Sequence, residues 1–140
     1  MKISMICFTL TGFHTGEKLK KNLEKEGHAV SLAAKSMYLP DSIKESTKEW
    51  AGMQFPVSDG IIFIGAAGIA VRSIAPYVQS KKSDPAVVVV DECGRFVISL
   101  LSGHLGGANA LAHQAAKILN AIPVVTTATD LQGKFGVDVF

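Results

Sequence analysis

Six short strand-like runs, separated by turns and by stretches with helical patterns, constrain the fold of this 140-residue chain most strongly. Most of them are apolar with little alternation, which is typical of strands covered on both faces. Strands that alternate with helices form layered sheets. We therefore predict an α/β fold, a layered α/β/α sandwich with a mostly parallel sheet. The expected strands cover residues 3–8, 28–33, 61–64, 86–91, 96–101 and 122–125.

The connections between these runs refine the prediction. Residues 92–94 form a tight turn between two strands, which predicts one antiparallel hairpin in the sheet. Repeats and internal linkers are absent from the sequence, so residues 1–140 are predicted to form a single α/β domain. The apolar stretch 136–140 has no polar tail, and we expect a further structural element after it. Residues 9–16 are expected to turn, and helices are expected over residues 17–26, 43–50, 67–75 and from residue 108 onward.

Composition excludes several classes of function. The net charge is only +2 and no run of Lys or Arg occurs, which argues against nucleic acid as a partner. No apolar run is long enough to span a membrane, and no signal peptide is recognisable. Two cysteines provide no disulfide framework and no metal-ligand cluster, so we expect no protein-bound metal and a cytoplasmic location.

A small-residue turn follows the predicted strand 61–64. Gly65 and Gly68 allow a sharp turn into a helix, whose first amides and dipole favour an anion. Arg72, one turn further on, has a guanidinium suited to carboxylates. Close helix–sheet packing and a solvated arginine explain the same residues. A nucleotide-binding domain is a further alternative, although the G-x-G-x-x-G pattern is absent.

The turn before the next helix is richer in chemical groups. It places Ser102, His104 and Asn109 around three glycines, of which Gly106 and Gly107 directly precede the helix. Imidazole transfers protons near neutral pH, and amide donors stabilise an oxyanion. A purely structural loop is the alternative interpretation.

Hydroxyl and carboxyl groups follow the last strand, with Thr127 and Asp130 as candidate ligands and turn formation as the alternative. In open α/β sheets, ligands bind beyond the carboxyl ends of the strands. We therefore expect these turns to gather at one edge of the sheet, with His104, Asn109, Arg72 and Asp130 in one cleft.

Read together and in order, these segments strongly resemble the CbiG family of cobalt-precorrin-5A hydrolases from about residue 59 to residue 138. Before residue 59 the resemblance is one of general pattern only. The segments that carry the resemblance are residues 64–72, 75–76, 82–91, 94–98, 101–112 and 126–130.

The resemblance implies hydrolysis of the δ-lactone of cobalt-precorrin-5A, with release of acetaldehyde and formation of cobalt-precorrin-5B in anaerobic cobalamin biosynthesis. The partner is then a tetrapyrrole, which brings its own cobalt, so no cofactor is expected. On this reading His104 is the general acid or base. Asn109 and the amides of Gly106 and Gly107 steady the oxyanion, and Arg72 holds a carboxylate arm.

The resemblance also implies that sequence is missing, because family members continue into a middle segment and a C-terminal domain. A contact with that domain, or with further copies of the chain, is expected. A non-catalytic module that binds the corrinoid or docks another enzyme of the pathway therefore remains the alternative to a hydrolase.

Overall fold

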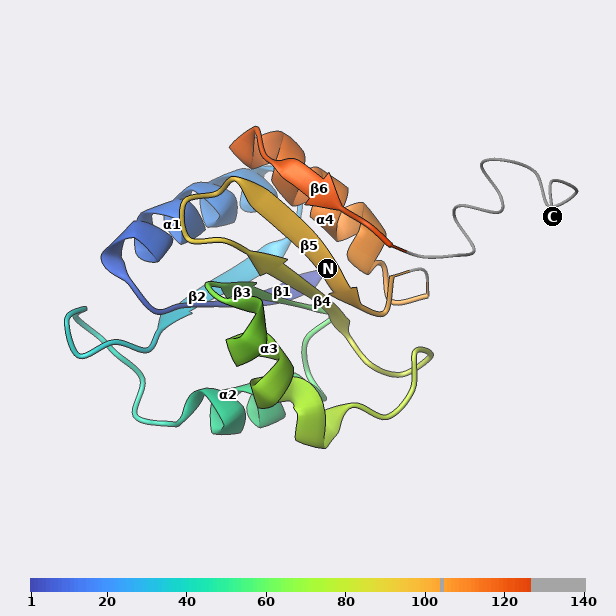
Figure 1. Cartoon of the computed structure of the whole chain (residues 1–140), viewed down its shortest axis with the longest axis horizontal. Helices are drawn as coiled ribbons and strands as arrows, with labels where there is room; N and C mark the ends of the chain where they lie inside the picture. Colours follow the sequence, from blue (N-terminus) through green and yellow to red (C-terminus); the bar gives the residue numbers. More distant parts are fainter. Residues whose placement is uncertain (104, 127–140) are drawn as a thin grey trace, which may run out of the picture.

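The computed structural model describes residues 1–103 and 105–126. Its centre is a six-stranded sheet in the order β2-β1-β3-β4-β5-β6 (Figure 1). The predicted strands are confirmed to within about two residues at their ends, the usual uncertainty of element boundaries. They are β1 (Lys2–Cys7), β2 (Ala29–Ala34), β3 (Gly60–Ile64), β4 (Ala86–Val90), β5 (Phe96–Leu101) and β6 (Ile122–Val124).

The sheet is mixed, as predicted. Strands β1 to β4 run parallel to one another, β5 is antiparallel to β4, and β6 is parallel to β5. A register shift between Val87 and Val88 leaves Leu100 as an extra residue on β5. Such a bulge bends the strand and locally increases its twist.

Helices cover both faces of the sheet (Figure 1). On one face lie α1 (Leu10–Lys25) and α4 (Ala108–Leu119), and on the other lie α2 (Thr47–Gln54) and α3 (Ala67–Ile74). A short 3₁₀ turn, η1 (Ala75–Tyr77), follows α3. The predicted α/β/α layering is thus confirmed.

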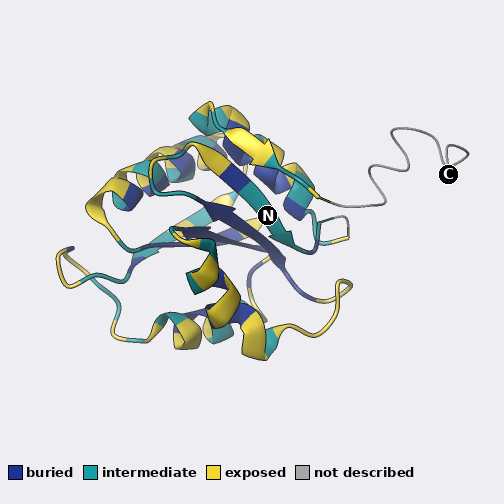
Figure 2. Cartoon of the chain, in the orientation of Figure 1, coloured by how far each residue is buried: buried dark blue, intermediate teal, exposed yellow. Residues whose placement is uncertain are grey.

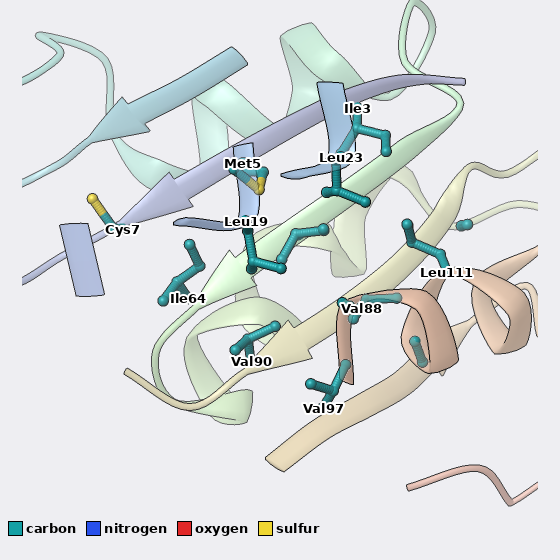
Figure 3. Close-up of a cluster of buried hydrophobic side chains, with 14 of the residues drawn as sticks. Ile3, Met5, Cys7, Leu19, Leu23, Ile64, Val88, Val90, Val97 and Leu111 are labelled. Atoms are coloured by element: carbon teal, nitrogen blue, oxygen red, sulfur yellow. The ribbon is translucent and has the colours of Figure 1, made fainter. Parts of the chain in front are cut away.

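The two central strands, β3 and β4, are buried at every position (Figure 2). This explains their unbroken apolar sequence, since both faces of these strands contact helices. Figure 3 shows the core on the α1 and α4 side, where Leu19 and Leu23 pack over the sheet beside Leu111.

The prediction of a turn over residues 9–16 was wrong, because α1 begins at Leu10. The Thr9 side chain accepts a hydrogen bond from the Gly12 amide and so caps the helix. A Cβ at Gly16 would lie 2.9 Å from the side chains of both Leu32 and Ile64. The glycine therefore serves close helix–sheet packing rather than a turn.

The second predicted helix was misplaced by about four residues, since α2 covers Thr47–Gln54 and not residues 43–50. Ser46 sets its start through a capping box with Glu49. The Trp50 ring then packs edge-on against Phe63, with 5.9 Å between the ring centroids.

Candidate functional site

The two glycine-bordered turns lie at opposite ends of the sheet. We call the end at which β1, β3 and β4 finish the carboxyl edge, and the other end the amino edge. Gly65 directly follows β3, at the carboxyl edge. Because β5 is antiparallel to β4, its last residue, Leu101, pairs with Val87 near the start of β4. Ser102 and the loop after it therefore lie at the amino edge.

The expectation of a single cleft was consequently wrong for Arg72 and Asn109. Five residues of strand separate the two edges, which amounts to roughly 16 Å of packed core. The reason is the direction of the hairpin strand: the rule that ligands gather beyond the carboxyl ends holds for strands that run the same way. Two candidate sites must therefore be considered separately.

At the amino edge, the loop of residues 102–107 is tied to the start of α4. Ser102 is buried, has a positive φ of 61°, and donates from Oγ to the Asp84 carbonyl at 3.3 Å. The Ala108 amide donates to the Ser102 carbonyl and the Asn109 amide to the Gly103 carbonyl, both at 3.0 Å. The second of these bonds occupies the backbone N–H of Asn109, so this amide does not serve as an oxyanion donor.

The two glycines of this loop meet different constraints. A Cβ at Gly106 would lie 2.4 Å from the Ser102 Cβ and 3.0 Å from its carbonyl oxygen, so no side chain fits. Gly107 precedes α4 with φ of 85°, a backbone conformation that favours glycine. Both positions thus require glycine for geometric reasons.

Asn109 occupies the first turn of α4 and is held by β5. Ser99 Oγ donates to Asn109 Oδ1 at 2.7 Å, and this bond fixes the orientation of the carboxamide. The two N–H donors lie on the other branch of the same group. The structure therefore supplies an oriented amide at the edge where the loop is found.

A hollow of about 320 Å³ adjoins this loop and is lined by Met1, Ser58, Asp59, Ser83, Asp84, Pro85, Leu105 and Gly106. Both carboxylates in its wall accept hydrogen bonds from backbone amides. Asp59 Oδ2 accepts from the Lys2 amide at 2.8 Å, and the Asp84 carboxylate accepts from the amides of Gln79 and Ser80. Sequence reasoning did not bring Asp59 and Asp84 to one place, because no spacing relates residues that sheet pairing brings together.

A second hollow, of about 280 Å³, opens beside the first and shares Ser83 and Asp84 with it. Its other walls come from the end of α2 and from η1, including Phe55 and Tyr77. Exposed Lys81 and Lys82 belong to the same loop as Ser83. The amino edge thus offers two neighbouring hollows beside a loop that carries two cationic side chains.

At the carboxyl edge, the start of α3 forms the other candidate site. A Cβ at Gly65 would lie 3.0 Å from the Phe8 ring, so the turn after β3 packs against the residue after β1. The Arg72 guanidinium folds back over Gly68, 3.4 Å from where a Cβ would be, and the side chain is exposed. No side chain caps α3. The helix start and the guanidinium therefore form a small cationic surface.

Three predicted site residues, His104, Thr127 and Asp130, lie outside the described residues. Within residues 1–103 and 105–126, no group of three His, Cys, Asp or Glu side chains is placed to hold a metal ion. Over the same ranges, no helix has the length and apolarity needed to cross a membrane.

The fold and these turns define the class of protein: a three-layer α/β domain with an open sheet whose strands extend in both directions from β1. Glycine-containing turns lie at both the carboxyl edge and the amino edge of this sheet. Residues 49–130 match the family model described as cobalamin synthesis G N-terminal. The chain belongs to this family.

Relatives and a solved structure support the same assignment. The chain is 58% identical over 136 residues to the cobalt-precorrin-5A hydrolase of Salmonella typhimurium LT2. The matched region covers 97% of this chain and 38% of that protein. It is 39% identical over 133 residues to the enzyme of the same name from Priestia megaterium, covering 95% of this chain and 31% of that protein. The crystal structure of a cobalamin biosynthesis protein G homolog from Sulfolobus solfataricus superposes with a TM-score of 0.72 at 29% identity, covering 94% of this chain and 39% of that chain.

The chain thus spans about a third of the length of the relatives that it matches. Their names place the family in cobalamin biosynthesis.

Proposed function

We propose that this chain provides the N-terminal part of a cobalt-precorrin-5A hydrolase. Water adds to the lactone carbonyl, the ring C–O bond breaks, and the products are a carboxylate and an alcohol. The alcohol then loses its proton as the adjacent carbon–carbon bond breaks. The two-carbon unit leaves as acetaldehyde, and the electron pair returns to the macrocycle.

One observation carries this proposal: the loop of residues 102–107, which lines a hollow at the amino edge through Leu105 and Gly106, leads directly into the helix turn that holds the oriented amide of Asn109. A lactone carbonyl becomes an oxyanion when water attacks, and donors held in place by the protein stabilise that charge most effectively. Ser99 holds the Asn109 carboxamide and Asp84 holds Ser102, so both groups are preorganised.

The remaining roles follow from position along the loop. His104 stays the proposed general acid or base because it stands between Gly103 and Leu105 in this loop. Lys82 is proposed to meet a carboxylate arm of the macrocycle, since its loop borders both hollows. The cobalt belongs to the substrate.

Replacing Asn109 with Asp tests the oxyanion role. Aspartate keeps an acceptor for Ser99 Oγ, but it replaces the N–H donors by a negative charge. We expect kcat for acetaldehyde release to fall by about a hundredfold or more. The thermal midpoint should change little. The assay uses cobalt-precorrin-5A and the chain joined to the remaining sequence of the Salmonella relative.

Ser99→Ala is the complementary control, because it removes the hydrogen bond that Asn109→Asp keeps and leaves the N–H donors of Asn109 in place. Its rate should stay within a few-fold of the parent. If both variants lose activity equally, the loss in Asn109→Asp cannot be assigned to its N–H donors, because losing the hydrogen bond from Ser99 alone has the same effect. An unchanged rate in Asn109→Asp would remove Asn109 from the mechanism.

A non-catalytic corrinoid-binding module is the second candidate, and the surface formed by Arg72 and Gly68 favours it. Carboxylates of the macrocycle would bind the planar guanidinium, which lysine does not reproduce. In this case Arg72→Lys should weaken binding of cobalt-precorrin-5A, measured by absorbance of the macrocycle, about tenfold, since one such contact is worth roughly 1.5 kcal/mol. Arg95→Lys, a change at the only other arginine of the chain, is the control.

The two candidates give opposite patterns. The hydrolase site at the amino edge predicts that Arg72→Lys leaves acetaldehyde release unchanged. A binding module predicts weaker binding in Arg72→Lys, and acetaldehyde release by the joined protein that does not depend on the residue at position 109.

A further inference from the structure

Strand β2 (Ala29–Ala34) forms an edge of the sheet without the features that usually protect an edge strand (Figure 1). Its six residues include no proline and no charged side chain, and its register with β1 is continuous. The opposite edge strand, β6, contains Pro123, and proline is a common protection of a strand edge. An open edge without such features pairs readily with a further strand.

The backbone groups that face this open edge can be assigned. The Ala29 amide donates to the Met1 carbonyl at 3.0 Å, so Ala29 directs its backbone groups towards β1. The backbone N–H and C=O of successive strand residues point alternately to the two sides, so Val30 and Leu32 direct theirs away from β1. Within residues 1–103 and 105–126, no hydrogen bond reaches these outward groups.

Both ends of the open stretch are closed by the chain itself. At one end, the Ile43 amide donates to the Ala34 carbonyl at 2.9 Å and occupies the next outward acceptor. At the other end, Gly27 has a positive φ of 96° in the turn that joins α1 to β2. The free donors and acceptors therefore belong to Val30 and Leu32, placed symmetrically on either side of Ser31.

A second copy of β2 in antiparallel orientation satisfies all of these groups. If Ser31 lies opposite its own equivalent, Val30 of each copy faces Leu32 of the other, and each such pair exchanges two N–H···O bonds. The Val30 and Leu32 side chains are partly buried and pack on the core cluster under α1. In the antiparallel pair they also cover each other across the junction.

The charges on α1 are complementary in the same arrangement. Thr15 donates to the Glu92 carbonyl at 2.7 Å, which identifies the side of α1 that faces the β4–β5 turn. Helical spacing places Glu17 and Lys20 on the opposite side, above the β2 edge. Their side chains are 57% and 39% exposed, and Lys20 contacts Glu24 at 3.5 Å.

The height of these charges relative to β2 follows from one close contact. A Cβ at Gly16 would lie 2.9 Å from the Leu32 side chain, so this part of α1 lies over Leu32. Helix α1 runs back between two parallel strands and rises about 1.5 Å per residue, so the level of Ser31 falls about two residues after Gly16. A two-fold axis at Ser31 then brings Glu17 of each copy opposite Lys20 of the other.

We infer that two copies of this chain associate through β2, antiparallel and with Ser31 at the two-fold axis, so that their sheets join into one. Backbone hydrogen bonds of Val30 and Leu32 and the pairs of Glu17 with Lys20 hold the copies together. The inference does not depend on the proposed reaction.

Cysteine cross-linking tests the register. Residues opposite each other in a non-hydrogen-bonded antiparallel pair have Cα atoms about 4.5 Å apart, which a disulfide can bridge. In the Cys93→Ser background, Ser31→Cys should therefore give a disulfide-linked dimer on mild oxidation. Ala29→Cys is the matched control, because this position is on the same face but roughly 13 Å from its equivalent along the strands. Equal cross-linking of both variants, or of neither, overturns the inference.

Sedimentation over rising concentrations of the full chain tests the association itself. We expect a reversible dimer, and Lys20→Glu should weaken it by roughly three- to tenfold, since it replaces two attractive pairs by two repulsive ones. Adding Glu17→Lys should restore the affinity. Lys18→Glu, which lies on the solvent side of α1, is the control and should have little effect. A chain that stays monomeric, or a double variant no tighter than Lys20→Glu, contradicts the inferred arrangement.

Amide hydrogen exchange locates the contact in the unmodified chain. The Val30 and Leu32 amides should exchange about tenfold more slowly in the dimer than in dilute monomer, because only the second copy provides their acceptors. The Ser31 amide faces β1 and should change little. A dimer in which the Val30 and Leu32 amides keep their monomer rates uses another surface, and this result would overturn the inference.

Discussion

At the scale of single residues, Gly106 is the most sharply constrained position of the candidate site. An added Cβ would lie 2.4 Å from the Ser102 Cβ and 3.4 Å from the Asp84 carbonyl oxygen. Gly106 therefore lies where its own loop packs closely against the loop that carries Asp84. Gly106→Ala must therefore displace the loop, and we expect the free energy of unfolding to fall by about 1–3 kcal/mol, the usual cost of overpacking. Urea unfolding measures this change.

Gly68→Ala is the matched control for that prediction. The nearest neighbour of the new Cβ would be the flexible Arg72 guanidinium at 3.4 Å, and the position lies inside α3. Alanine is a better helix residue than glycine, so stability should stay equal or rise by about 0.5–1 kcal/mol. If both variants unfold alike, the space around Gly106 is not what constrains it.

At the scale of elements, the start of α2 rests on the capping box of Ser46 and Glu49. Ser46 Oγ accepts from the Glu49 amide at 3.1 Å, and Glu49 Oε1 accepts from the Ser46 amide at 3.0 Å. Ser46→Ala should lower the free energy of unfolding by about 1 kcal/mol. Thr47→Ala, one residue on, should cost less, since its hydroxyl makes no hydrogen bond to the described residues.

The hydrogen bonds that Glu49 receives at Ser46, from the backbone first, lower the pKa of its carboxyl group from 4.5. Ionised Glu49 therefore stabilises the folded state at pH values above the pKa that this group has in the unfolded chain. That contribution disappears as the pH falls through the lower pKa of the folded chain. The same capping box was readable from S-x-x-E in the sequence. It would have set the helix start at residue 47, whereas apolar spacing alone set the start too early.

Helix α1 shows a case in which a local sequence signal was misleading. Gly12 and Gly16 looked like turn residues, but they face Ile64 and Leu32 across the helix–sheet contact. Only the three-dimensional packing distinguishes a glycine required for closeness from one required for a turn. The strands were predictable because burial on both faces leaves its mark in sequence, as in β3 and β4.

At the scale of the whole molecule, the antiparallel hairpin was predicted, but its consequence for the site was missed. Reversing β5 sends Ser102 to the amino edge while Gly65 stays at the carboxyl edge. The sequence identified the turns that carry glycines and polar groups. Whether two such turns meet depends on strand direction and order, which no single turn encodes.

The stability of the whole sheet should also depend on Cys7, which ends β1 and is fully buried. Burial raises the pKa of the Cys7 thiol from 9.0 to about 11. The unfolded chain therefore loses this proton at lower pH than the folded chain does, and stability must fall between pH 9.0 and about 11. The loss approaches roughly 2–3 kcal/mol, since one pKa unit is worth about 1.4 kcal/mol.

Urea unfolding at several pH values measures this in a Cys93→Ser background, which removes the exposed thiol. Adding Cys7→Ala should lower stability at every pH because it opens a cavity in the core. It should also abolish the part of the pH dependence that Cys7 contributes, because only the thiol titrates, so the two curves should converge as the pH rises above 9.0. Parallel curves would mean that Cys7 reaches solvent in the folded chain, and the closed core around β1 would then have to be reconsidered.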